Sequence, residues 1–206
     1  MNNMNWLAVA PEIFLLAMAC VVLLADLYVT CPQRRPTYWL TMLTLAGVAG
    51  LHIGYLDSEV SGYAMQGMIV TDPMGHLLAL CATLAVMASL AYSQAYAGAR
   101  DMLKGELFTL SLFSLLGISI MIAGNNFLVI YLGLELMSLS LYAVVALRRD
   151  HAQATEAAMK YFVLGALASG FLLYGLSMVY GATGSLDIAE VYQATLAGDL
   201  NKQVLA

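Results

Sequence analysis

One acidic residue of this sequence lies deep inside an apolar stretch. Glu135 is about eleven residues from the start of an apolar segment at 124–147, roughly 17 Å along a helix that rises 1.5 Å per residue. An ionisable group at that depth in a bilayer is costly to insert, and it is a functional candidate for that reason. We therefore expect Glu135 to bind and release a proton.

Polar side chains extend from Glu135 along one helix face. Tyr131, Glu135, Ser138 and Tyr142 follow the spacing i, i+4, i+7 and i+11, which places them on the same side of a helix. This polar stripe is a candidate proton path. The alternative is that Glu135 stays protonated and only hydrogen-bonds a neighbouring helix. We favour proton exchange, because Gln or Ser would suffice for hydrogen bonding alone.

Lys160 is the second candidate for proton translocation. It lies a few residues into the apolar segment at 156–180, and Glu156 precedes it by four residues. That spacing favours a helical ion pair, and a shallow lysine can extend its ammonium group to the membrane surface. Lys160 is separated from Glu135 by roughly 12 Å along the membrane normal, too far for direct contact. A functional and a purely local role both remain open from the residues alone.

Other titratable residues have simpler interpretations. Glu12 follows Pro11 and is expected to bind backbone groups freed by the proline. Asp26 is expected at the membrane interface, and Glu106 at the positive end of a helix dipole. The histidines at 52 and 76 are expected to be hydrated near outer helix ends, and the one at 151 to lie in a loop.

These side chains must be positioned by membrane-spanning helices. Of the 206 residues, 62% are hydrophobic and 10% charged, too few polar groups to cover a soluble globule. The net charge of −5 gives no basic surface for nucleic acid. Only helices satisfy their backbone within a segment in lipid, and about 20 apolar residues span it. The sequence predicts an all-α polytopic bundle with six spans: 6–28, 37–56, 73–96, 105–123, 124–147 and 156–180.

Basic residues predict the orientation of the bundle. Every Arg or Lys that lies between two spans is in the connection after the first, third or fifth span: Arg34, Arg35, Arg100, Lys104, Arg148 and Arg149. Because cytoplasmic loops collect Lys and Arg, the N-terminus is expected outside, in the periplasm of a bacterium. The acidic connection at 57–72 is then an external loop, with Asp72-Pro73 as the start signal of the third span.

Two regions are expected along the chain. Residues 1–180 form the six-helix transmembrane bundle, in which small residues at 165–170 allow close helix packing. Residues 181–206 form an interfacial segment, in which Asp187 and Glu190 resemble a capping box. The apolar residues at 204–206 predict the start of a seventh span, so the sequence is expected to be the N-terminal part of a longer chain.

The cysteines and sequence motifs offer no redox centre. Cys20, Cys31 and Cys81 are odd in number and lack a paired CxxC spacing, so they are interpreted as small core residues rather than as disulfides or metal ligands. The sequence has no GxGxxG motif, phosphate loop or HExxH motif. Any redox cofactor is therefore expected in another chain.

Two segments carry a resemblance to a known family. The segments NNFLVIYLGLELMSLSLY at 125–142 and EAAMKYFVLGALASG at 156–170 resemble the subunit N family of bacterial NADH:quinone oxidoreductase, respiratory complex I. The similarity extends over essentially the whole chain, including Pro11-Glu12 and the turn at 180–184. Mrp-type sodium/proton antiporters are similar more distantly.

The resemblance implies the fold and the partners. It implies an antiporter-like bundle of about fourteen helices built from inverted repeats, in which Glu135 matches the glutamate that pairs with a lysine of helix 7. Lys160 matches a helix-6 residue that is also charged in the family. NAD, FMN, iron–sulfur clusters and quinone would belong to partner subunits, and other membrane-arm subunits would surround this chain in the bacterial inner membrane.

The expected function is that of a translocase subunit. The chain would couple NADH oxidation and quinone reduction to proton transport, with Glu135 and Lys160 as its translocating groups and Tyr131, Ser138 and Tyr142 along the path. The alternative is an Mrp-type sodium/proton antiporter subunit, which would transport ions without NADH.

Overall fold

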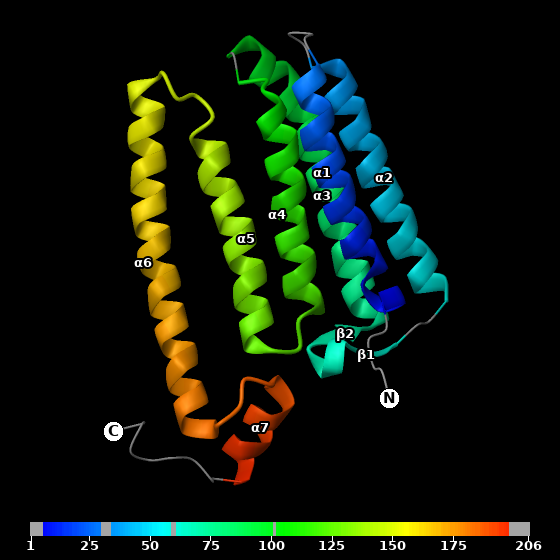
Figure 1. Cartoon of the computed structure of the whole chain (residues 1–206), viewed down its shortest axis with the longest axis vertical. Coiled ribbons are helices and arrows are strands. Elements are labelled where there is room, and N and C mark those ends of the chain that lie inside the picture. Colours follow the sequence, from blue (N-terminus) through cyan, green and yellow to red (C-terminus); the bar gives the residue numbers. More distant parts are fainter. Residues whose placement is uncertain (1–5, 30–33, 59–60, 101, 198–206) are drawn as a thin grey trace.

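Six long helices run side by side and alternate in direction (Figure 1). The computed structural model describes residues 6–29, 34–58, 61–100 and 102–197. The long helices are α1 (Ala10–Tyr28, preceded by a 3₁₀ turn at Trp6–Val9), α2 (Arg35–Asp57), α3 (Pro73–Ala99), α4 (Gly105–Ala123), α5 (Phe127–Val145) and α6 (Ala152–Thr183). All six are long and apolar enough to cross a membrane. The six spans expected from the sequence are therefore confirmed as helices.

Local signals set several helix ends. α3 begins at Pro73, and the Asp72 side chain accepts a hydrogen bond from the Gly75 N–H at 2.9 Å, as its capping sequence predicts. α6 continues to Thr183 and ends at Gly184, whose φ of 76° is a left-handed conformation that glycine adopts without strain. A short helix, α7 (Ile188–Ala197), follows.

The capping box expected before α7 is half formed. The Asp187 carboxylate accepts hydrogen bonds from the N–H groups of Ala189 at 2.9 Å and Glu190 at 3.3 Å. The Glu190 carboxylate instead accepts a hydrogen bond from the Ser185 hydroxyl. The start of a seventh span, expected at 204–206, lies outside the described residues.

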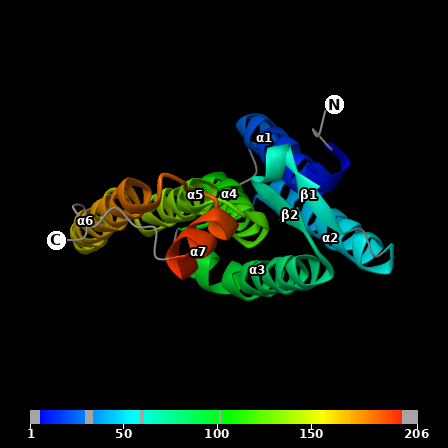
Figure 2. The same cartoon turned by 90° about the horizontal axis from the view of Figure 1, so that it is seen from below.

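The hydrophobic core lies among the first four helices. Its buried side chains come from α1, α2, α3 and α4: Leu15, Ala19, Val22, Leu45, Val48, Leu90, Phe108, Leu112, Leu115 and Leu116. Helix α5 packs against α4, and α6 packs against α5 at the edge of the molecule (Figure 2). Most of α6 is consequently not covered by protein within this chain.

Two glycines let α4 and α5 approach closely. A Cβ atom on Gly117 would lie 2.5 Å from the Gly133 carbonyl oxygen and 2.6 Å from the Met137 nitrogen. A Cβ atom on Gly133 would lie 2.8 Å from the Gly117 carbonyl oxygen. Small residues at this crossing therefore set the distance between the two helix backbones.

A β-hairpin covers one end of the bundle, where the sequence predicts only a loop. Strands β1 (Gly62–Ala64) and β2 (Ile69–Thr71) pair antiparallel, with Tyr63 opposite Val70. The turn between α4 and α5 joins this hairpin to the segment before α7: the Asn125 N–H donates to the Met68 carbonyl at 2.8 Å, and the Phe127 N–H donates to the Leu186 carbonyl at 2.9 Å. Backbone pairing therefore connects three separate parts of the chain at this end.

The described parts of the connections that carry Arg and Lys lie together at the opposite end of the bundle (Figure 1). The occurrence of basic residues in every second connection predicts this arrangement. Arg34 forms an ion pair with Asp26 at 2.7 Å, and the Thr37 hydroxyl donates to the same carboxylate at 2.8 Å. Arg149 forms an ion pair with Glu106 at 2.7 Å. The second ion pair thus links the connection after α5 to the start of α4.

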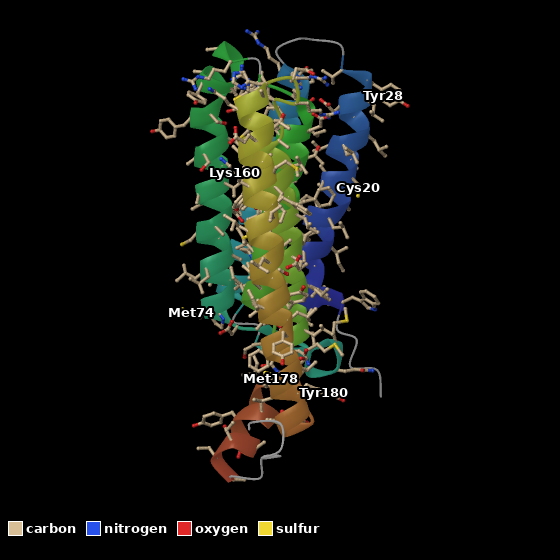
Figure 3. All side chains as sticks on the ribbon, turned by 90° about the vertical axis from the view of Figure 1, so that its left-hand side faces the viewer. Cys20, Tyr28, Met74, Lys160, Met178 and Tyr180 are labelled. Atoms are coloured by element: carbon tan, nitrogen blue, oxygen red, sulfur yellow. The ribbon has the colours of Figure 1, made fainter. Side chains whose placement is uncertain are left out.

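The expected core placement of the cysteines is wrong for the two that are described. Cys20 on α1 and Cys81 on α3 are both exposed at the outer surface of the bundle, where Figure 3 labels Cys20. A cysteine is apolar enough for either the core or an exposed face in a membrane, so hydrophobicity alone did not distinguish the core face of these helices from the exposed face. Cys31 lies outside the described residues.

Candidate functional site at the interface of two helices

Glu135 lies near the middle of α5, half-buried at the interface with α6. Its carboxylate accepts a hydrogen bond from the Ser169 hydroxyl of α6. A charge-assisted hydrogen bond to a carboxylate is stronger than one between neutral groups. The carboxylate is therefore oriented toward α6 by a partner on that helix.

The Tyr131 hydroxyl extends this contact. Its oxygen lies 3.0 Å from the Ser169 oxygen, so Ser169 lies between two residues of the polar stripe. A serine hydroxyl carries one proton and two lone pairs. It can donate to Glu135 while it accepts from Tyr131, and the three groups form a continuous hydrogen-bonded chain from α5 to α6 and back.

Ser169 is the site residue that the sequence reasoning missed. The sequence pattern predicts only close packing for Ser169 and its small neighbours. Spacing on one helix cannot identify a partner on another helix. A hydroxyl among the small residues of the adjacent span is the only signal that the sequence offered.

The other two stripe residues have different surroundings. The Tyr142 ring packs edge-on against Tyr161 and Phe162, with ring centroids 5.0 Å and 5.6 Å away. Its hydroxyl lies against Gly165, where a Cβ atom would be only 1.9 Å from the Tyr142 oxygen. Ser138 is half-buried on α5. The structure thus joins Tyr131 to Glu135 through Ser169, whereas Tyr142 fixes the spacing of α5 and α6.

Lys160 is placed apart from this chain of hydroxyls. Its ammonium nitrogen lies 2.6 Å from the Glu156 carboxylate, and its side chain is 71% exposed (Figure 3). The local ion pair that the spacing predicts is confirmed. Among the described ion pairs and hydrogen bonds, none joins Lys160 to Glu135.

The expectation that the first two histidines are hydrated is wrong. His52 is 1% exposed and His76 is 5% exposed. They lie beside one another where α2 ends and α3 begins, under residues of α1, α4 and the hairpin. Residues far apart in sequence cover them, so their positions near helix ends did not reveal their burial.

The fold matches solved respiratory membrane complexes. A chain of respiratory complex I from Thermus thermophilus with bound aureothin superposes with a TM-score of 0.72 at 28% identity, over 86% of this chain and 38% of that chain. A chain of an archaeal membrane-bound sulfane sulfur reductase has a TM-score of 0.73 at 24% identity, over 96% and 41% of the two chains. The second match shows the fold alone.

The described chain has six membrane-length helices, and a mid-helix carboxylate accepts a hydrogen bond from a hydroxyl of the next helix. These two features define a polytopic membrane protein with a polar site inside its helical bundle. Residues 124–206 match the family model of the NADH:quinone oxidoreductase/Mrp antiporter transmembrane region. The chain is 57% identical over 205 residues to NADH-quinone oxidoreductase subunit N of Polaromonas naphthalenivorans, and 54% identical over 209 residues to that of Herminiimonas arsenicoxydans. Over nearly its whole length the chain is similar to the NADH-quinone oxidoreductase subunit N family.

The match covers nearly all of this chain but only part of its relatives. It includes 99% of the chain and 41% of the Polaromonas protein, and 100% of the chain and 42% of the Herminiimonas protein. The chain thus spans about two fifths of the length of these curated relatives.

Proposed function

We propose that this chain is part of a proton-translocating membrane subunit of an NADH:quinone oxidoreductase. In this proposal, NADH oxidation and quinone reduction in other subunits drive proton transport through the membrane. The observation that carries it is the placement of Glu135 at mid-helix, in hydrogen-bond contact with a hydroxyl of α6. A scaffold would not require an ionisable group at this depth.

The hydrogen-bonded chain supports a specific proton movement. A hydronium ion gives a proton to the Tyr131 oxygen and is left as water, Tyr131 gives its own proton to Ser169, and Ser169 gives its proton to the Glu135 carboxylate. Each oxygen gains one O–H bond and the two hydroxyls each lose one, so Glu135 becomes neutral and the hydroxyls are unchanged. The hydrogen bonds then point in the opposite direction, and the hydroxyls must rotate before the next transfer.

Lys160 has a secondary place in the proposal. Its exposure and its ion pair with Glu156 favour a role at the membrane surface nearest the basic connections. From there its positive charge acts electrostatically on the proton path. Ser138 and Tyr142 line the face of α5 that carries Glu135. Glu135 remains the group that carries the proton.

The redox cofactors and partners are assigned to other chains. NAD, FMN, iron–sulfur clusters and quinone would be bound by partner subunits of a bacterial inner-membrane complex. Large apolar side chains on α6, such as Leu164, Leu167 and Phe171, are not covered by protein within this chain. They are suited to contact lipid or further membrane helices.

Mild detergent extraction tests this assignment. The protein that carries this segment should be recovered in a large complex that oxidises NADH and contains flavin and iron–sulfur clusters, which this segment has no motif to bind itself. Size-exclusion chromatography with absorbance detection would measure this. Recovery as a separate protein that exchanges sodium for protons in vesicles without NADH would support the antiporter alternative instead.

Cysteine labelling tests the proposed orientation, with the hairpin end outside. Gly62 on the hairpin and Gln153 at the start of α6 are exposed at opposite ends of the bundle. After the native cysteines are replaced with Ser, Gly62→Cys should react with an impermeant maleimide in intact cells, and Gln153→Cys only after the membrane is opened. The reverse pattern would show that the orientation is inverted.

A further inference from the structure

Unpaired polar atoms gather at one cavity among α1, α2, α3 and α4. Five buried side-chain nitrogen or oxygen atoms in the described part of the chain have no hydrogen-bond partner. Four of them belong to residues lining the same cavity: Glu12 Oε2, His52 Nε2, His76 Nε2 and Ser119 Oγ. Each comes from a different helix. The cavity has a volume of about 10 Å³, which is the space of about one water molecule.

The two histidines form a hydrogen-bonded pair. Their Nδ1 atoms lie 3.2 Å apart, so one Nδ1 donates a proton and the other accepts it. In a neutral pair, the donating ring therefore has a bare Nε2 and the accepting ring has an Nε2–H. The two free Nε2 atoms are then one acceptor and one donor. Two fully protonated rings would place two N–H groups against one another.

Four unpaired groups at one cavity are not expected in a folded protein. Buried polar groups are nearly always paired with protein or ordered water, because an unmade hydrogen bond carries the full cost of desolvation. A carboxylate oxygen and a bare imidazole nitrogen require donors, whereas a hydroxyl and an Nε2–H can donate. A water molecule satisfies both requirements, and an added proton is stabilised by the carboxylate.

We propose that Glu12, His52, His76 and Ser119 form a buried binding site for one water molecule and one exchangeable proton. The proton is shared between the Glu12 carboxylate and the histidine pair, and Ser119 binds the water. This site lies on α1 to α4, and its argument uses no contact of the α5–α6 site. It therefore does not depend on the function proposed for Glu135.

The surrounding groups are compatible with one bound proton. Asp72 also lines the cavity, but one of its carboxylate oxygens already accepts the Gly75 N–H. The Tyr55 ring lies 5.1 Å from the His76 ring, and its hydroxyl donates to the Leu7 carbonyl. The lining residues from the hairpin and α4 add no charge. Two carboxylates and two histidines line one cavity, and this combination favours a site that retains a proton.

A metal ion fits this arrangement less well. Within the described ranges, no group of three or more His, Cys, Asp or Glu side chains converges as metal ligands. The two Nδ1 atoms are also bound to one another. The geometry therefore favours water and a proton over a cation.

Two measurements on the intact purified complex test the site. High-resolution cryo-electron microscopy should show a water peak within hydrogen-bond distance of the Ser119 oxygen, and Ser119→Ala should remove it. Infrared difference spectra between neutral and acidic pH should contain a buried carboxyl band that Glu12→Gln abolishes. His52→Gln should move the pH midpoint of that band by about one pH unit, a tenfold change in proton affinity.

Matched variants separate this site from other carboxylates and histidines. Glu190→Gln and His151→Gln change exposed residues of the same types and should leave the band and its midpoint unchanged. Glu135→Gln should also leave them unchanged, so failure of the translocation proposal would not be mistaken for failure of this one. The proposal would be overturned if the cavity held no water peak. It would also be overturned if His52→Gln left the pH midpoint of the Glu12 carboxyl band unchanged. If Glu12→Gln does not assemble, Ser119→Ala and His52→Gln still decide the question.

Discussion

Glu135→Gln is expected to reduce NADH-driven proton transport by about tenfold or more while the complex still assembles. Gln retains the size of Glu and can accept the Ser169 hydrogen bond, but it cannot ionise. The hydroxyl chain then ends at a group that cannot take up the proton. Transport should be measured in proteoliposomes as the proton gradient formed per NADH oxidised.

Three comparisons make this result specific. Glu135→Asp keeps a titratable group and should retain more transport. Ser169→Ala removes the hydroxyl between Tyr131 and Glu135 and should have an intermediate effect. Lys160→Ala should have the smallest effect, because that side chain is exposed and paired with Glu156.

All variants must be compared at equal abundance of the complex, since a lost complex would imitate a lost proton path. If Glu135→Gln transports protons as well as the wild-type protein, the stripe serves only helix packing. The proposed mechanism would then be wrong.

Gly133→Ala is expected to cause a large loss of stability. Its new Cβ atom would meet the Gly117 carbonyl oxygen at 2.8 Å and the Met121 nitrogen at 3.0 Å. Both are backbone atoms, so no side-chain rotation relieves the contact, and α5 must move away from α4. Such overpacking typically costs about 1–3 kcal/mol. Thermal unfolding in detergent and the abundance of the complex in membranes would measure the effect.

A second glycine provides the control. A Cβ atom on Gly50 of α2 would have no other atom within 4 Å, and alanine is the better helix former by about 1 kcal/mol. Gly50→Ala should therefore be neutral or stabilising. An equal response to Gly50→Ala and Gly133→Ala would mean that close α4–α5 packing is not what the glycine at 133 provides.

The sequence alone determined the spans, their alternation and several helix ends. Each of these depends on a short stretch of chain and its solvent: about 20 apolar residues cross a bilayer, basic residues collect at one side, and Asp72 or Asp187 caps the helix that directly follows it. The position of Glu135 near mid-helix was predicted in the same way, because depth is counted along one helix. Local physics was sufficient for these features.

Only the tertiary structure decided which side chains meet. Ser169 reaches Glu135, and the buried His52 and His76 share a cavity with Glu12 and Ser119. The helical period gives the face of each residue, but the rotation and register of one helix against another depend on packing across the whole bundle. Lipid and protein interior are equally apolar, so hydrophobicity could not separate the core face of a helix from its exposed face, as the exposed Cys20 demonstrates.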